Sequence, residues 1–144
     1  MGPAPAHSCR VLLVDDEEPL LRAWTRELHR LGVEAWTARS GRDAESVLAR
    51  FPGHFDAVAC DLHMPDGSGM EFYRFLVTEY PGVEHRVVFV TGGAISDTET
   101  EFLRTAGNPV LEKPCELGPL VKLAREWAGR RLTRGANAGE DRRR

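Results

Sequence analysis

The feature that most constrains this sequence is an alternation of short apolar runs with longer segments of helical periodicity. The apolar runs are brief and rich in valine, leucine or alanine, as in strands buried on both faces. Strands that alternate with helices form a parallel sheet covered on both faces, with right-handed crossovers. We therefore predict strands at 10–14, 33–38, 57–61, 87–90 and 109–111.

The segments after these runs carry helix start and stop signals. Ser40 and Ser96 are expected N-caps, and Glu99 completes a capping-box pattern three residues after Ser96. Helix-ending residues follow the periodic runs at Gly32, Pro52, Pro81 and Gly107. The chain is thus an α/β protein of five strand–helix units. The mixed polar and apolar strand at 33–38 is expected at or near a sheet edge.

Size and composition predict a single cytoplasmic domain. The chain has 144 residues, of which 42% are hydrophobic, enough for one core. Apolar runs such as 11–14 and 87–90 are far shorter than a membrane span, and residues 1–7 lack the apolar segment of a signal peptide. The three cysteines do not have the spacing of a zinc site or a disulfide framework, so they are expected to be reduced packing residues: Cys9, Cys60 and Cys115.

Charge divides the chain unevenly. Residues 130–144 contain six arginines and two acids, a local charge of +4, which leaves −7 on residues 1–129 of a chain whose formal net charge is −3. We predict a flexible leader at 1–9, a folded domain at 10–131 and a basic, disordered tail at 132–144. The acidic body argues against a nucleic-acid partner, because such a surface must neutralise phosphates.

Polar residues stand where the predicted strands end. Asp15 and Asp16 follow the first strand, and Asp61 ends the third. Thr91 follows the fourth strand and Lys113 the fifth. Parallel strands present their carboxyl ends at one sheet edge, where ligands collect in open α/β sheets. These five residues are therefore expected to form one site.

The residue types indicate the chemistry of this site. Three neighbouring carboxylates repel one another and need a cation, and an oxygen-only ligand set suits Mg²⁺. A carboxylate beside the metal can attack phosphorus, and Asp61 is the expected nucleophile. Lys113 and Thr91 would supply a cation and a hydrogen bond to the phosphoryl oxygens. Gly92 and Gly93 would leave the approach to Asp61 open.

These motifs together resemble the receiver domain of two-component response regulators. The resemblance covers residues 10 to about 130 and includes four segments: Asp15-Asp16, the stretch 61–65 with Gly69 eight residues after the aspartate, Thr91-Gly92, and Lys113-Pro114. It implies a flavodoxin-like, doubly wound (βα)5 fold in a single domain with strand order 2-1-3-4-5.

The same resemblance implies the activity. Asp61 would accept a phosphoryl group from a phosphohistidine on a histidine kinase or a phosphotransfer protein. The receiver would assist its own phosphorylation and dephosphorylation rather than act as an enzyme on other substrates. The cofactor would be Mg²⁺, with Mn²⁺ as a possible substitute. Asp16 and Asp61 would bind it directly, Asp15 largely through water, and the backbone carbonyl of His63 would complete the protein ligands.

Two positions carry separate expectations. The side chain of His63 could meet incoming water or the phosphohistidine partner, but a solvent-facing loop histidine is the favoured interpretation. Many receivers have an aromatic residue three positions before the lysine, where this chain has Val110. That aromatic ring turns inward on activation in those relatives. Asp66 and Glu17 are expected to be turn and helix-start residues rather than metal ligands.

Three alternatives remain open. An aspartyl-phosphate phosphohydrolase would place its nucleophile after the first strand with a second acid two residues on, whereas here the two acids are adjacent. A pseudo-receiver that serves only as a protein-binding module would not need the acids, Thr91 and Lys113. The chain could also be either a stand-alone regulator or a receiver module of a hybrid sensor histidine kinase, and the kinase, signal and output are not specified by the sequence.

Overall fold

Five parallel strands form the central sheet of this protein. The computed structural model describes the backbone of residues 8–64 and 67–141, with side chains as far as Arg130. The strand order is β2-β1-β3-β6-β7, which is the expected order 2-1-3-4-5 when these five strands are counted along the chain. The strands are β1 (Arg10–Val14), β2 (Glu34–Ala38), β3 (Ala57–Asp61), β6 (Val87–Thr91) and β7 (Val110–Glu112).

Burial of the strands follows their place in the sheet. Every residue of the central strands β3 and β6 is buried, which explains why both are apolar up to their last, polar residue. The edge strand β2 is largely exposed or half-buried, as its mixed sequence predicts. The other edge strand, β7, has no fully buried residue. The apolar content of each run therefore depends on whether the strand has one neighbour or two.

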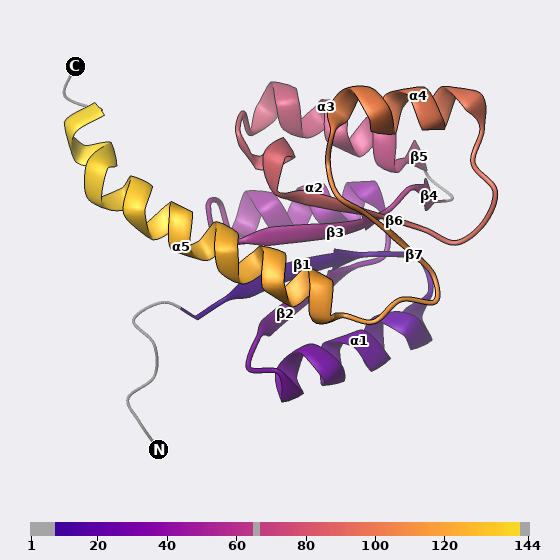
Figure 1. Cartoon of the computed structure of the whole chain (residues 1–144), viewed down its shortest axis with the longest axis horizontal. Coiled ribbons are helices and arrows are strands. Elements are labelled where there is room, and N and C mark those ends of the chain that lie inside the picture. Colours follow the sequence, from indigo (N-terminus) through magenta and orange to yellow (C-terminus); the bar gives the residue numbers. More distant parts are fainter. Residues whose placement is uncertain (1–7, 65–66, 142–144) are drawn as a thin grey trace.

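Helices cover both faces of the sheet, as Figure 1 shows. Leu28 of α1 and Leu120 of α5 belong to the core on one face, whereas Leu48 of α2 and Leu76 of α3 belong to the core on the other, with Phe102 of α4 packed against it. The doubly wound architecture is thereby confirmed. The helices are α1 (Glu18–Arg30), α2 (Gly41–Arg50), α3 (Gly69–Glu79), α4 (Asp97–Ala106) and α5 (Gly118–Asp141), with a short 3-10 helix η1 (Val83–Arg86).

The expected helix caps are present. The Ser40 hydroxyl accepts a hydrogen bond from the Asp43 amide at 3.0 Å. Ser96 and Glu99 form the complete capping box at the start of α4. Ser68 caps α3 in the same way by accepting from the Glu71 amide at 3.2 Å, a cap that the sequence analysis did not anticipate. Short polar side chains thus define where three of the helices begin.

The carboxyl-terminal helix is longer than expected. Its backbone is helical as far as Asp141, across residues 132–141, for which the sequence favours a disordered tail. Arginine, alanine and leucine, which occur in this stretch, are good helix formers. The domain limit at residue 131 stays a prediction. In the part of the chain that the structure describes, we find no helix that combines the length and apolarity needed to cross a membrane.

The segment between β3 and α3 is more ordered than a simple turn. It contains a small antiparallel pair, β4 (His63–Met64) with β5 (Gly67–Ser68), which the sequence analysis missed because strands of two residues carry no periodic signal. Pro65 and Asp66, which the sequence assigns to a turn, lie outside the described residues.

Gly69 is required by a close approach of two backbones. Its amide donates to the Leu62 carbonyl at 2.9 Å, which holds the first residue of α3 against the end of β3. A Cβ atom at this position would lie 2.8 Å from the Asp61 carbonyl oxygen and 3.1 Å from the Leu62 Cα. Glycine therefore allows α3 to begin beside the strand end that carries Asp61.

Candidate functional site

Four of the five strands of the main sheet deliver polar residues to its carboxyl edge. Asp15 and Asp16 follow β1, Asp61 ends β3, Thr91 ends β6 and Lys113 follows β7. One carboxylate oxygen from each of the three aspartates lies within 4.8 Å of the other two. The structure thus brings together the three acids that the sequence places at strand ends. Asp15 and Asp61 are buried, whereas Asp16 is exposed.

Lys113 is the cation that lies among these acids. Its Nζ atom is 2.7 Å from Asp15 Oδ2, 3.2 Å from Asp61 Oδ2 and 3.2 Å from Glu17 Oε1. Partial burial opposes the charged form, but the hydrogen bonds that Lys113 donates to Asp15 and Glu17 and the negative charges of Asp61 and Asp15 outweigh it and raise the pKa of Lys113. The lysine therefore carries a positive charge at neutral pH and offsets part of the acidic charge.

Gly92 makes room for this lysine. A Cβ atom on Gly92 would lie 3.3 Å from Lys113 Cδ, closer than a comfortable packing contact, whereas a Cβ on Gly93 would meet nothing within 4 Å. The first glycine thus sets where the lysine stem passes. The second has open space around its Cα, and the expectation that the two glycines leave the approach to Asp61 open stays a prediction.

Asp61 is held in a fixed orientation at the end of β3. Only 6% of the residue is exposed, and Oδ1 accepts a hydrogen bond from the His63 amide at 3.1 Å while Oδ2 accepts one from Lys113 Nζ at 3.2 Å. Burial raises the pKa of the Asp61 carboxyl, an effect that the His63 amide and Lys113 oppose and the charge of Asp15 reinforces. A further cation at this site would therefore stabilise the ionised carboxylate.

The turn after β1 places the other two acids. Asp15 Oδ1 accepts a hydrogen bond from the Glu17 amide at 2.9 Å, and the Asp15 amide continues the sheet ladder by donating to the Ala38 carbonyl at 3.0 Å. The Asp15 side chain is thereby turned back toward β3, and Asp16 stays open to solvent. Three converging carboxylates with only oxygen donors fit a hard divalent cation such as Mg²⁺.

Thr91 lies one strand away from Asp61. In the sheet register Asp61 is opposite Val90, so Thr91 extends one residue beyond the aspartate, and its carbonyl accepts from the Lys113 amide at 2.7 Å. The residue is 5% exposed, and its hydroxyl makes no hydrogen bond to another described residue. A role of this hydroxyl toward a ligand stays a prediction.

The sequence analysis missed two contacts of the site. Glu17, interpreted only as a helix-start residue, does occupy the N-cap position of α1, but its carboxylate also pairs with Lys113. The His63 side chain is 49% exposed, yet its Nε2 atom pairs with Glu99 Oε2 instead of facing only solvent. Neither contact follows from a motif, because each depends on where a distant side chain lies.

None of the three cysteines, all of which lie among the described residues, forms a disulfide. Cys9 and Cys60 are buried and Cys115 is half-buried. Burial raises the pKa of the Cys60 thiol, and the charges of Asp61 and Asp15 raise it further. A protonated, buried thiol is unreactive, so Cys60 contributes packing beside Asp61, as expected.

Comparison with known proteins gives one consistent family. Residues 11–125 match the model of the response regulator receiver domain. Response regulator protein PilR of Pseudomonas aeruginosa is 31% identical over 114 residues, which cover 79% of this chain and 25% of that protein. The aerobic respiration control sensor protein ArcB of Escherichia coli is 28% identical over 124 residues, which cover 85% of this chain and 16% of that protein.

The solved structures agree with this family. A response regulator receiver domain protein from Clostridium thermocellum superposes with a TM-score of 0.72 at 25% identity, over 87% of this chain and 98% of that one. This chain thus spans nearly all of a receiver structure. It spans only about a quarter of the length of a curated regulator such as PilR.

Proposed function

Because this chain belongs to the response regulator receiver domain family of two-component signalling, we propose that Asp61 accepts a phosphoryl group from a phosphohistidine on a histidine kinase or phosphotransfer protein. The observation that carries the proposal is the convergence of Asp61 with two further aspartates and Lys113 at one sheet edge. A buried carboxylate with fixed hydrogen bonds, beside a cation, is suited to nucleophilic attack on phosphorus.

The acid cluster would also hold the metal. In the proposal Asp16 and Asp61 bind Mg²⁺, or Mn²⁺ in its place, with Asp15 acting largely through water and the His63 backbone carbonyl as a further ligand. The bound ion would offset the charge of the transferring phosphoryl group. The three carboxylates within 4.8 Å of one another support this assignment.

The residues of the chain then have distinct roles. One Asp61 carboxylate oxygen forms the new bond to phosphorus as the phosphorus–nitrogen bond of the donor breaks and the donor imidazole leaves. Lys113, already 3.2 Å from Asp61 Oδ2, pairs with the added phosphoryl oxygens, and the Thr91 hydroxyl donates a hydrogen bond to them. Water later cleaves the acyl phosphate at the same site. The chain thus assists its own modification and its reversal.

The direct test is phosphoryl transfer to the intact chain. Incubation with acetyl phosphate and Mg²⁺ should add one phosphoryl group as a base-labile acyl phosphate, detected by intact mass. The same experiment without Mg²⁺ provides the control. Failure to form any adduct with Mg²⁺ present would favour a module that only binds proteins, and steady release of phosphate from small phosphomonoesters would favour a phosphohydrolase.

Mg²⁺ is expected to stabilise the fold. A ligand that binds only the native state adds about 2.7 kcal/mol at a hundred times its dissociation constant, and here it also relieves repulsion among carboxylates. Thermal melts with and without millimolar Mg²⁺ measure the gain. Asp16→Ala should lose most of it, whereas Asp97→Ala, which removes an exposed acid of α4, should retain it. An equal Mg²⁺ shift in wild type and Asp16→Ala contradicts the ligand assignment.

The response to phosphorylation should be concentrated near Thr91. Val110 is 40% exposed on the edge strand β7, and as a β-branched residue without a ring it cannot make the inward swing of an aromatic residue. We expect beryllofluoride to shift backbone amide signals of residues 91–100 more than those of 108–121. Larger shifts around Val110 and the start of α5 would show that the relay runs through β7 after all.

The place of this chain in a pathway is also a proposal. Its relatives include a response regulator and a sensor protein, so a stand-alone regulator and a receiver module of a hybrid sensor histidine kinase both agree with the matches. In either case we propose that the transfer takes place in the cytoplasm, where cysteines outside disulfides, such as the three in this chain, stay reduced.

A further inference from the structure

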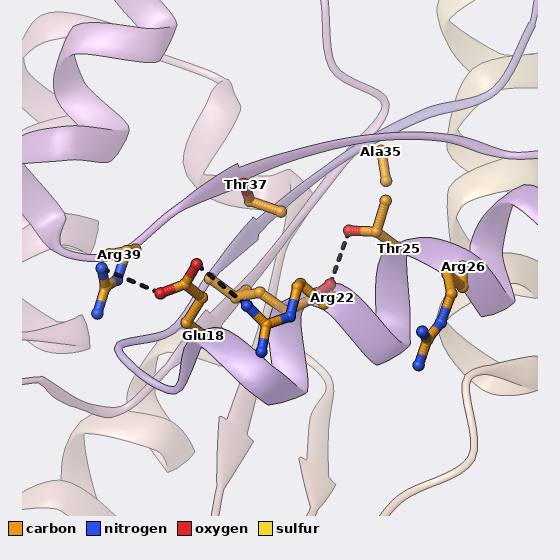
Figure 2. A pocket seen from close by; sticks show the side chains of 8 residues that line it. Glu18, Arg22, Thr25, Arg26, Ala35, Thr37 and Arg39 are labelled. Atoms are coloured by element: carbon orange, nitrogen blue, oxygen red, sulfur yellow. Dashed lines mark hydrogen bonds and ion pairs between the residues drawn. The ribbon is translucent and has the colours of Figure 1, made fainter.

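A groove runs between helix α1 and the edge strand β2, and it shares no lining residue with the acid cluster. We call it the α1–β2 groove; its volume is about 480 Å³. Leu21 of α1 and the side chains of Ala35 and Thr37 from β2 form its floor. In Figure 2 the two β2 side chains point toward α1, so they lie on the same face of the sheet as the helix. The floor is largely apolar.

The rim of the α1–β2 groove is basic. Arg22 and Arg26 project from α1, and Arg39 follows β2. Glu18 is the acid of the lining, and its two oxygens pair with Arg22 at 3.3 Å and Arg39 at 3.4 Å. Arg26 has no ion-pair partner among the described side chains. The groove thus carries a local charge of +2 on a body of charge −7, and Arg22 and Arg39 keep 65% and 62% of their side chains exposed.

The backbone beside the groove is also available. The Glu34 amide donates to the Cys9 carbonyl at 2.9 Å, and the Ala38 carbonyl accepts from the Asp15 amide at 3.0 Å, so residues 34 and 38 face β1. Alternate residues of a strand direct their amide and carbonyl groups to opposite sides. Ala35 and Thr37 therefore direct theirs to the open edge, where β2 has no neighbouring strand among the described residues.

We propose that the α1–β2 groove binds an acidic peptide segment of a partner protein, which adds to β2 as a sixth strand of the sheet. Backbone hydrogen bonds to Ala35 and Thr37 supply affinity, as in other strand-addition complexes. An added strand would project alternate side chains onto the α1 face, where acidic ones meet Arg22, Arg26 and Arg39. The intervening side chains would lie on the other face beside Trp36 and should be apolar. The expected ligand alternates acidic and apolar residues.

A second copy of this chain fits the edge less well. Antiparallel pairing of two β2 strands would bring the two basic rims together, and like charges placed opposite one another are destabilising. The charge of the rim therefore favours a different, acidic partner. None of the groove residues belongs to the acidic site, so the proposal stands apart from phosphoryl chemistry.

The test uses a fluorescent seven-residue peptide that alternates valine and glutamate. Binding to the full chain, followed by fluorescence anisotropy at low salt, should be saturable, and the matching valine–lysine peptide should not bind. The double variant Arg26→Gln/Arg39→Gln should weaken binding roughly tenfold, since an exposed charge pair is worth roughly threefold in affinity and two are removed. The control Arg50→Gln/Arg104→Gln makes the same change of net charge outside the groove and should bind like wild type.

The backbone contribution is tested separately. Thr37→Pro removes an amide that faces the open edge, which an edge strand tolerates, and should abolish binding, whereas Thr37→Val should preserve it. If Thr37→Pro does not fold, two N-methylated peptides give the same test, one methylated at the valines and the other at the glutamates. Alternate peptide residues direct their amides toward β2, so one of the two peptides must lose binding. The proposal is overturned if the valine–glutamate peptide does not bind or if both methylated peptides bind like the parent peptide. It is also overturned if sulfate displaces the peptide fully, or if the chain dimerises through the β2 edge.

Discussion

Asp61→Asn is expected to abolish formation of the acyl phosphate and, at the same time, to raise the thermal stability of the chain without Mg²⁺. The loss follows because the amide lacks the nucleophilic carboxylate oxygen. The gain follows from the raised pKa of Asp61: the folded protein disfavours the ionised form, and this cost is present at any pH above the folded pKa. A neutral side chain of the same shape removes the cost at pH 7.

Two measurements separate these effects. Intact mass after treatment with acetyl phosphate and Mg²⁺ reports phosphorylation, and thermal melts at pH 7 in EDTA report stability. As the pH falls through the pKa of Asp61, the wild-type carboxyl becomes neutral and no longer lowers the thermal stability. The melting temperatures of wild type and Asp61→Asn should therefore converge in acid. Undiminished labelling of the variant would show that another residue is the acceptor, and Asp97→Asn, in the first turn of α4, controls for loss of an exposed acid.

Gly69→Ala is expected to destabilise the fold by about 2–3 kcal/mol, the scale of overpacking in a tightly packed region. The added Cβ would lie 2.8 Å from the Asp61 carbonyl oxygen and 3.1 Å from the Leu62 Cα, and both are backbone atoms that cannot rotate away. The start of α3 must then shift and weaken the 2.9 Å hydrogen bond from Gly69 to Leu62. Chemical denaturation measures the loss.

Gly93→Ala provides the matched control for this substitution. A Cβ on Gly93 meets nothing within 4 Å, and the residue does not have a positive φ. Its stability should therefore equal that of wild type or exceed it slightly, because alanine lowers the entropy of the unfolded chain. Equal stabilities for Gly69→Ala and Gly93→Ala would mean that the α3 backbone adapts at no cost.

The positions of the strands and the gathering of the acids at one sheet edge were predictable from the sequence for one physical reason, whereas the strand order came from the resemblance to receiver domains. A strand that is buried on both faces is mostly apolar, so the apolar runs that end at Val14, Cys60 and Val90 stand out from their surroundings. Parallel strands then bring their ends together without any knowledge of side-chain positions. The meeting of Asp15, Asp16 and Asp61 then follows once β1 and β3 are neighbours, as the strand order of the receiver family implies.

The features that could not be predicted depend on short segments or on three-dimensional placement. The pairing of β4 with β5 involves only two residues on each strand, too few for a periodic pattern. The contacts of Lys113 with Glu17 and of His63 with Glu99 join residues far apart in the chain. The α1–β2 groove is likewise a property of the folded surface, since its arginines are spread through ordinary amphipathic sequence.

The two carboxylate oxygens of Glu99 bind two different partners, and this links the start of α4 to the end of β3. One of its oxygens accepts the Ser96 amide at 2.8 Å and closes the capping box of α4, while the other pairs with His63, two residues beyond Asp61. The same carboxylate therefore connects the first turn of α4 with the segment that follows β3, and both of these begin at the carboxyl edge of the sheet. Helix α4 cannot tilt away from the end of β3 without either breaking this tie or unwinding its own first turn.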